Sequence, residues 1–179
     1  RKSKNSKEEI ILDVNKLAVG FEFFQISNWT ISPDEKTIAF AQDTTGRREY
    51  EIIFRDITTG KNLPSSLERT SGDMAWSEDG RTFFYVERHK ETLLPHKLFK
   101  HKVGDQQKNA VLVFKEMDPT FYVSVGNTRS KKYIEIYITS SKSDEVKGSS
   151  ILPFKSTIIV KDGEKVKAGQ IIVKIPKDV

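Results

Sequence analysis

The sequence predicts an all-β protein: a partial β-propeller of about three blades, followed by a small β-hairpin unit. Short strand patterns separated by tight turns dominate the chain, and little of it has helical spacing. A strand–turn–strand unit recurs at intervals of about 40–50 residues, which is typical of propeller blades. The composition also changes near residue 147, where aromatic residues become scarce. An all-β meander with coincidental turns is the alternative.

The first element follows a basic stretch at residues 1–7, which we interpret as a frayed arm. Residues 8–18 carry apolar side chains at helical spacing, but the same residues fit a strand at 10–12 followed by a short helical turn. We expect the second arrangement.

The first repeat unit covers residues 29–41 and reads as strand, turn, strand. Pro33 restricts φ in the turn, and Asp34 can bond the backbone that follows it. Another strand is predicted at 50–57, after a turn at 43–46.

The second unit, residues 74–86, matches the first at a 45-residue offset, with Ser77 at the position of Ser32. Trp29 and Trp76 are interpreted as equivalent residues that pack the blade cores. A looser third copy follows 50 residues on, with strands at 121–125 and 133–138. Further strands are expected between these copies, at 97–102 and 110–114.

The C-terminal part is rich in Ile, Val and Lys and forms a segment of its own in this interpretation. Strands are expected at 157–160 and 170–175, with turns at 161–163 and 166–169. The predicted organisation is therefore an arm at 1–7, blades at 8–146 and a small β unit at 147–179.

Composition narrows the function classes. Charged residues make up 31% of the chain and hydrophobic residues 36%, a balance that suits strands with one solvated face. The net charge of +5 comes from scattered side chains of both signs, so we expect no nucleic-acid surface. The chain has no cysteine, which excludes disulfides and thiolate chemistry. It has no membrane-length apolar stretch and no signal peptide, and we expect a cytoplasmic protein.

A search for catalytic motifs predicts no catalytic, cofactor-binding or metal-binding residue. The chain has no Gly-x-Ser-x-Gly motif, and Gly148, Ser149 and Ser150 are interpreted as a linker. The three histidines, His89, His96 and His101, lack the spacing of a zinc motif and are expected at the surface or in blade packing. The carboxylates of Asp34, Asp79 and Asp162 are predicted at turns, where aspartate is favoured for local hydrogen bonds, so none is expected to be catalytic.

Residues 8–146 resemble oligopeptidase B, a serine peptidase (hydrolase) of the prolyl oligopeptidase family. The resemblance lies in phrases that keep the family's order and spacing, at residues 8–15, 17–24, 31–34, 55–56, 59–60, 70–76 and 125–130. It implies the early blades of a seven-bladed propeller that covers an α/β-hydrolase domain and admits short peptides, which are cut after Lys or Arg. The catalytic domain has no counterpart in this sequence, so a catalytic triad is not expected in it.

Residues 148–179 resemble a segment of the bacterial RNA polymerase β′ subunit, where it belongs to a sandwich-barrel hybrid fold. The matching phrases are residues 151–157, 160–170 and 175–179. Biotinyl and lipoyl carrier domains share the turn of Asp162 and Gly163, but a carrier needs a modifiable lysine on a later hairpin.

Two function classes follow. The first is a non-catalytic propeller segment that controls access to a catalytic domain, with peptide substrates only when joined to that domain. The second is a truncated or fused remnant that acts as an interaction module and self-associates through open blade edges. The β′-like tail adds a transcription-related fragment as a further alternative. No cofactor and no membrane partner are expected.

Overall fold

The computed structural model describes residues 8–141, 146–153, 157–158 and 173–174, and almost all of its regular structure is β-strand. In the described part, the helices are one α-helical turn and one 3₁₀ turn: α1 (Val14–Leu17) and η1 (Gln107–Asn109). The strands are β1 (Gln25–Ile31), β2 (Thr37–Asp43), β3 (Tyr50–Asp56), β4 (Asn62–Trp76), β5 (Thr82–Arg88), β6 (Pro95–Lys102), β7 (Val111–Lys115), β8 (Phe121–Asn127), β9 (Tyr133–Ser140), β10 (Val146–Pro153), β11 (Thr157–Ile158) and β12 (Val173–Lys174). None of the helices among these residues is long and apolar enough to cross a membrane.

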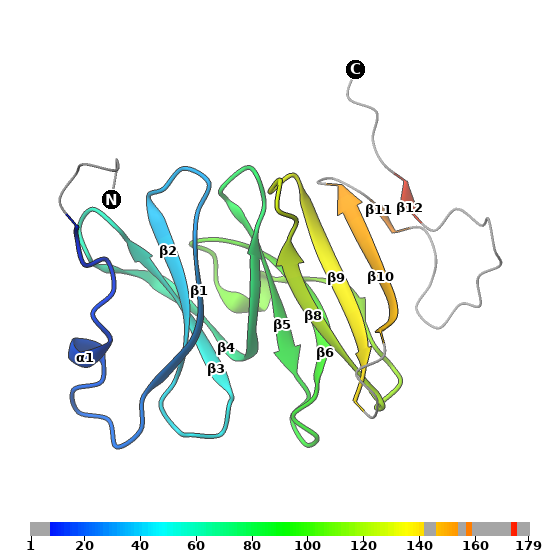
Figure 1. Ribbon diagram of the computed structural model, residues 1–179, viewed down its shortest axis with the longest axis horizontal. Helices are drawn as coiled ribbons and strands as arrows, with labels where there is room; N and C mark the ends of the chain where they lie inside the picture. Colours follow the sequence, from blue (N-terminus) through cyan, green and yellow to red (C-terminus); the bar gives the residue numbers. More distant parts are fainter. Residues whose placement is uncertain (1–7, 142–145, 154–156, 159–172, 175–179) are drawn as a thin grey trace.

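The strands follow one another in sequence order, as antiparallel neighbours. One sheet runs from β1 to β7, a second pairs β10, β9 and β8, and a third pairs β11 with β12. In Figure 1 they run from α1 and β1 at one side to β8, β9 and β10 at the other, and the two large sheets stay open. The prediction of an open, all-β partial propeller is confirmed.

Strand β4 belongs to two blades. Its first part, from Asn62 to Thr70, pairs with β3, and its later part pairs with β5, at Thr70 and again from Met74 onward. The register shifts between these parts, where Gly72 adopts φ +90°. A Cβ at Gly72 would lie 2.6 Å from the Ser27 hydroxyl oxygen, so the bend requires glycine for space as well as for φ.

The seven-stranded sheet is therefore two four-stranded blades joined through β4. We call β1, β2, β3 and the first part of β4 blade 1, and the rest of β4 with β5, β6 and β7 blade 2. Blade 3 consists of β8, β9 and β10. The strand in residues 62–71 was not foreseen, because this polar stretch lacks the alternation that marks a strand.

The repeated hairpin has the same backbone hydrogen bond in all three blades. The Ser32 N–H donates to Thr37 C=O at 2.8 Å, and the Ser77 N–H donates to Thr82 C=O at 2.8 Å, which confirms the 45-residue repeat. In blade 3 the Thr128 N–H donates to Tyr133 C=O at 3.1 Å. Thr128 follows Ser77 by 51 residues, so the third unit lies one residue further on than the predicted 50.

The two tryptophans are not equivalent, and this prediction is wrong. Trp76 pairs with Phe83 in the register, whereas the residue at the same place in blade 1 is Ile31, which pairs with Ile38. Trp29 lies two residues earlier on β1. Trp29 is 59% exposed, against 3% for Trp76, which packs edge-on against Phe54 and Phe83.

Two local predictions are also wrong: the strand at residues 10–12 and the linker at residues 148–150. Residues 10–12 form no strand, although the short helical turn after them is confirmed as α1, which Asp13 caps by accepting the Lys16 N–H at 3.2 Å. Gly148, Ser149 and Ser150 are not a linker, since their backbone pairs with β9 in β10.

Side chains from facing blades form two cores. The first lies between blades 1 and 2 and contains Ala39, Ala41, Tyr50, Ile52, Phe54, Leu67, Met74, Trp76, Phe83 and Tyr85. The second lies between blades 2 and 3 and contains Ala75, Val86, Leu98, Val123, Val125, Ile134 and Ile136. Full burial of one large apolar side chain stabilises the fold by roughly 1.5–3 kcal/mol, so these contacts hold the blades together.

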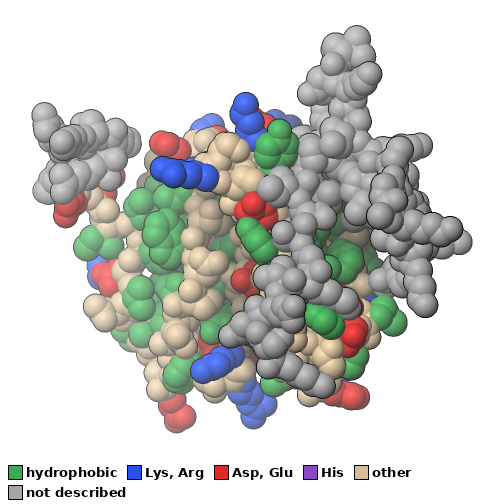
Figure 2. Space-filling view, turned by 45° about the vertical axis from the view of Figure 1, so that its right-hand side comes forward, with side chains coloured by type: hydrophobic (Ala, Val, Ile, Leu, Met, Phe, Trp, Pro, Cys, Tyr) green, Lys and Arg blue, Asp and Glu red, His purple; other side chains and the backbone are tan. Residues whose placement is uncertain are grey.

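In the C-terminal part, β11 pairs with β12 antiparallel, in agreement with strands expected at 157–160 and 170–175. The predicted turns at 161–163 and 166–169 lie outside the described residues, and the division of the chain at residues 7 and 146 stays a prediction. On the face shown in Figure 2, apolar side chains reach the surface among charged side chains of both signs.

Candidate functional site

A cleft of about 680 Å³ opens at one end of blade 2. Its walls come from the end of β5, the hairpin between β5 and β6, and the connection from β7 to β8. Arg69 on β4 closes one side. Hairpins and connections carry these side chains, and the strands of blade 2 fix the ends of those loops. The cleft therefore has a rigid base of strands and a rim of loop residues.

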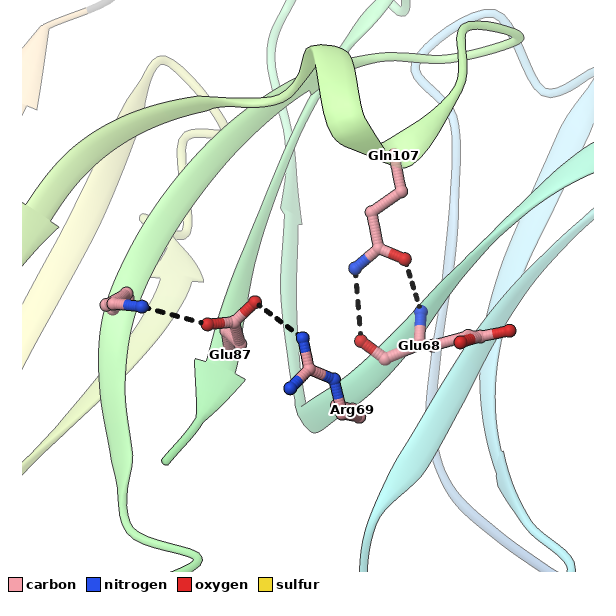
Figure 3. Close-up of polar contacts among 5 residues, drawn as sticks. Glu68, Arg69, Glu87 and Gln107 are labelled. Atoms are coloured by element: carbon pink, nitrogen blue, oxygen red, sulfur yellow. Dashed lines mark hydrogen bonds and ion pairs between the residues drawn. The ribbon is translucent and has the colours of Figure 1, made fainter. Parts of the chain in front are cut away.

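Glu87 organises the charges of this cleft. Its carboxylate oxygens lie 3.2 Å from Lys97 Nζ and 3.6 Å from an Arg69 guanidinium nitrogen, as Figure 3 shows for the labelled pair. The three residues come from β5, β6 and β4, so the ion pairs link blade 1 to blade 2. The side chains of Arg69 and Lys97 are about one third exposed, which keeps the expected stabilisation below roughly 1 kcal/mol for each pair.

Two of the three histidines meet at the rim of the cleft. The rings of His89 and His96 are 5.0 Å apart and inclined by 66°. His89 Nδ1 accepts hydrogen bonds from the Glu91 and Thr92 N–H groups, at 3.2 and 3.3 Å. Burial lowers the pKa of His96 below its usual range, and the charges of Lys97 and His89 lower it further. The pair therefore packs the hairpin, as expected from the sequence.

His101 lies apart from the cleft, in the first core. It is 2% exposed and its ring stacks on Phe54 at 6.4 Å. Burial lowers its pKa, and the charge of Asp105 raises it by less.

Of the three aspartates predicted at turns, the structure describes Asp34 and Asp79, and both lie at turns. Asp34 accepts the Ser32 hydroxyl at 2.6 Å and the Lys36 N–H at 3.2 Å, and these bonds lower its pKa. Asp79 accepts the Arg81 and Thr82 N–H groups at 2.9 and 2.8 Å. Asp162 lies outside the described residues.

Sequence reasoning missed two features: the cleft itself and the contact of Gln107 with blade 1. The side-chain amide of Gln107 accepts the Glu68 N–H at 2.9 Å and donates to the Glu68 C=O at 3.1 Å (Figure 3). It thus occupies an edge position of β4, as a neighbouring strand would. No local sequence pattern predicts a contact between two residues that lie 39 positions apart in the chain.

The inner strands of the three blades are joined by two asparagines. Asn28 Nδ2 on β1 donates to the Gly72 C=O at 3.3 Å, and Asn127 Nδ2 on β8 donates to the Trp76 C=O at 2.8 Å. Both acceptors lie on β4, so β1, the end of β4 and β8 stand next to one another as one wall. A wall of inner strands is what lines the central channel of a closed propeller.

Among the described residues, no three His, Asp or Glu side chains are grouped so that they could hold a metal ion. The cleft therefore offers charged side chains of both signs and two imidazoles for non-covalent contacts.

Comparison with known proteins matches residues 1–166 to the family described as the prolyl oligopeptidase N-terminal β-propeller domain. Dipeptidyl aminopeptidase BI of Pseudoxanthomonas mexicana is 37% identical over 140 residues, which cover 78% of this chain and 19% of that protein. Oligopeptidase B from Trypanosoma brucei, solved in a closed form with covalently bound antipain, is 28% identical with a TM-score of 0.72, covering 86% of this chain and 21% of that one. The chain thus spans about a fifth of the length of these relatives.

A shorter match concerns a different protein. A stretch of 53 residues is 43% identical to the RNA polymerase β′ subunit of Flavobacterium psychrophilum, and it covers 30% of this chain and 4% of that subunit. Both resemblances stated from the sequence are therefore confirmed, the propeller over most of the chain and the polymerase over a short part of it.

Proposed function

Because the chain belongs to the prolyl oligopeptidase family, as part of its N-terminal β-propeller domain, we propose that it is a non-catalytic propeller segment of an oligopeptidase B-like serine peptidase. In this role it controls the access of short peptides, cut after Lys or Arg, to a catalytic domain.

The inner wall of strands carries this proposal. The two asparagine side chains tie β1 and β8 to β4, so neighbouring blades present their inner strands in a row. Blades that continue this row around an axis enclose a passage, and the width of the passage limits what can enter. The likeness to an oligopeptidase B solved in a closed form supports a role in admission and enclosure of the substrate.

A chimera tests the proposal. Residues 8–141 replace the matching segment of the Pseudoxanthomonas mexicana enzyme, and turnover is measured on a short peptide ester with Arg and on an unfolded protein of more than 100 residues. We expect the chimera to cut the short substrate and to reject the long one, as its parent is expected to do. Loss of this size limit, or a folded chimera without activity, contradicts the proposal.

The isolated chain provides the complementary test. We expect no hydrolysis of an Arg or Lys ester by the chain alone. Turnover that a serine-directed inhibitor abolishes would show that the chain carries a catalytic site of its own.

One observation favours a second candidate function, a transcription-related interaction module. This observation is the 53-residue match to the polymerase β′ subunit. The measurement is binding of the chain to bacterial RNA polymerase core enzyme, with a variant that lacks residues 147–179 as the control. Binding that depends on these residues supports the second function, and its absence leaves the peptidase segment as the function.

A further inference from the structure

His101 is a polar residue in an apolar position. It lies on β6 of blade 2, opposite Phe83 in the register, and its ring stacks on Phe54 of blade 1 at an interplanar angle of 22°. Phe54 also packs edge-on against Trp76 and Phe83, with ring centroids at 6.0 and 4.9 Å. The imidazole is thus part of the aromatic cluster that joins blade 1 to blade 2.

Both ring nitrogens of His101 are buried, and neither has a hydrogen-bond partner in the part of the chain that the structure describes. A neutral imidazole carries one donor and one acceptor, and an imidazolium carries two donors and a charge. Burial without partners costs free energy for the neutral ring and considerably more for the charged one.

The aromatic residues beside His101 offer no acceptor for a second proton. Phe54 on β3 and Phe83 on β5 are apolar, and Trp76 on β4 has only an indole N–H, itself buried without a partner. Asp105, on the connection that follows β6, is the charged group whose field reaches the ring, and its effect is smaller than that of burial. Protonated His101 therefore has no compensation inside the cluster.

We propose that His101 is an acid-sensitive joint between blades 1 and 2, at which uptake of one proton from solvent separates the aromatic cluster and loosens blade 1. The site is independent of the function proposed above, because it is a property of the blade contact.

The direction of the pH effect follows from proton binding. Burial holds the pKa of His101 in the folded chain below the ordinary histidine value of 6.5, so the opened or unfolded chain binds the proton more tightly. The contact between blades 1 and 2 is most stable above pH 6.5, and its stability decreases as the pH falls from 6.5 towards the pKa of His101 in the folded chain. With one proton taken up, the opening equilibrium constant rises by up to about tenfold per pH unit in this window.

Two other described groups have shifted pKa values. The pKa of His96 is also lowered, chiefly by burial, and this residue adds an acid sensitivity at the cleft. Burial raises the pKa of Asp73, which contributes in the opposite direction. Separate substitutions of His101 and of His96 distinguish these contributions, since Asp73 is present in every variant.

The experiment compares the native chain with His101→Phe and with His96→Gln as the matched control. Amide hydrogen exchange of β3 and β6 is measured at pH 7.5 and 5.5. We expect exchange in these strands to accelerate several-fold at pH 5.5, after correction for the intrinsic rates, in the native chain and in His96→Gln. The His101→Phe chain is expected to keep its protection at both pH values.

Equal acceleration in His101→Phe and in the native chain would overturn the proposal. A second variant, His101→Leu, serves where phenylalanine does not fit the cluster. NMR titration of the His101 ring in the native chain gives an independent answer, because a ring that titrates at or above pH 6.5 has no reason to open the joint.

Discussion

Gln107 holds Glu68 by its backbone, with one hydrogen bond from the Glu68 N–H at 2.9 Å and one to the Glu68 C=O at 3.1 Å. The two residues belong to different blades: η1 follows β6 in blade 2, and this part of β4 is the outer strand of blade 1. The amide side chain therefore stabilises the contact between the blades and covers a section of an open strand edge.

Replacement of Gln107 by leucine removes both hydrogen bonds. We expect the free energy of unfolding to fall by about 0.5–1.5 kcal/mol, since water can replace the amide at this exposed place. The freed edge is also expected to increase self-association. Urea unfolding and sedimentation velocity measure the two effects. Gln106→Leu is the control, because Gln106 makes no side-chain capping bond, and equal effects of the two variants would contradict this role for Gln107.

The repeated hairpins place their fourth residue in the left-handed region: Glu35 at φ 58°, Gly80 at φ 62° and Lys131 at φ 60°. Gly80→Ala is expected to lower the free energy of unfolding by roughly 1–2 kcal/mol through the backbone alone, since its Cβ would meet only ordinary contacts. The converse change, Glu35→Gly, is expected to be neutral or to stabilise by about 0.5 kcal/mol. Thermal unfolding distinguishes the two, and a destabilisation of the same size in both would show that the conformation carries no strain.

Asp43 organises the turn after β2. Its buried carboxylate accepts the N–H groups of Thr45, Gly46 and Arg48 at 2.8, 3.0 and 2.7 Å. Asp43→Ala leaves these donors without their acceptor, and we expect a loss of about 2–3 kcal/mol in unfolding free energy. Asp34→Ala, at an exposed turn, is the control and is expected to cost about 1 kcal/mol.

The Asp43 carboxylate also makes the free energy of unfolding depend on pH in acid. Burial raises the pKa of Asp43, but the N–H donors outweigh this effect and hold the pKa below the ordinary aspartate value of 3.8. Its contribution is present above pH 3.8 and is lost as the pH falls further, towards the folded pKa. Urea unfolding between pH 2 and 5 should show a weaker pH dependence in Asp43→Ala than in the native chain. An unchanged slope would contradict the assignment.

The two tryptophans are expected to behave differently on substitution. Trp76→Ala opens a cavity in the first core and is expected to cost about 3–5 kcal/mol, whereas Trp29→Ala is expected to change stability by less than about 0.5 kcal/mol. Iodide quenching of the single-tryptophan chains Trp29→Phe and Trp76→Phe is a second measurement. Quenching should be weak when Trp76 remains and strong when Trp29 remains, and the reverse order would contradict their placement.

The sequence by itself determined the features that depend on neighbouring residues. Turn chemistry around Ser32 and Ser77 is local, so the hairpins and their 45-residue repeat could be read from the chain, and so could the all-β class and the family. The turn positions of Asp34 and Asp79 follow from the same local hydrogen bonds.

Tertiary structure alone decided which residues meet across the blades. Trp76 is buried because it packs against Phe54 and Phe83, whereas Trp29 is exposed, and Gln107 reaches Glu68 across 39 residues. No pattern in the sequence predicts that the His101 imidazole stacks on Phe54 without a hydrogen-bond partner. These contacts arise because blades stack face to face, and the stacking brings together side chains whose separation along the chain carries no information about their distance in space.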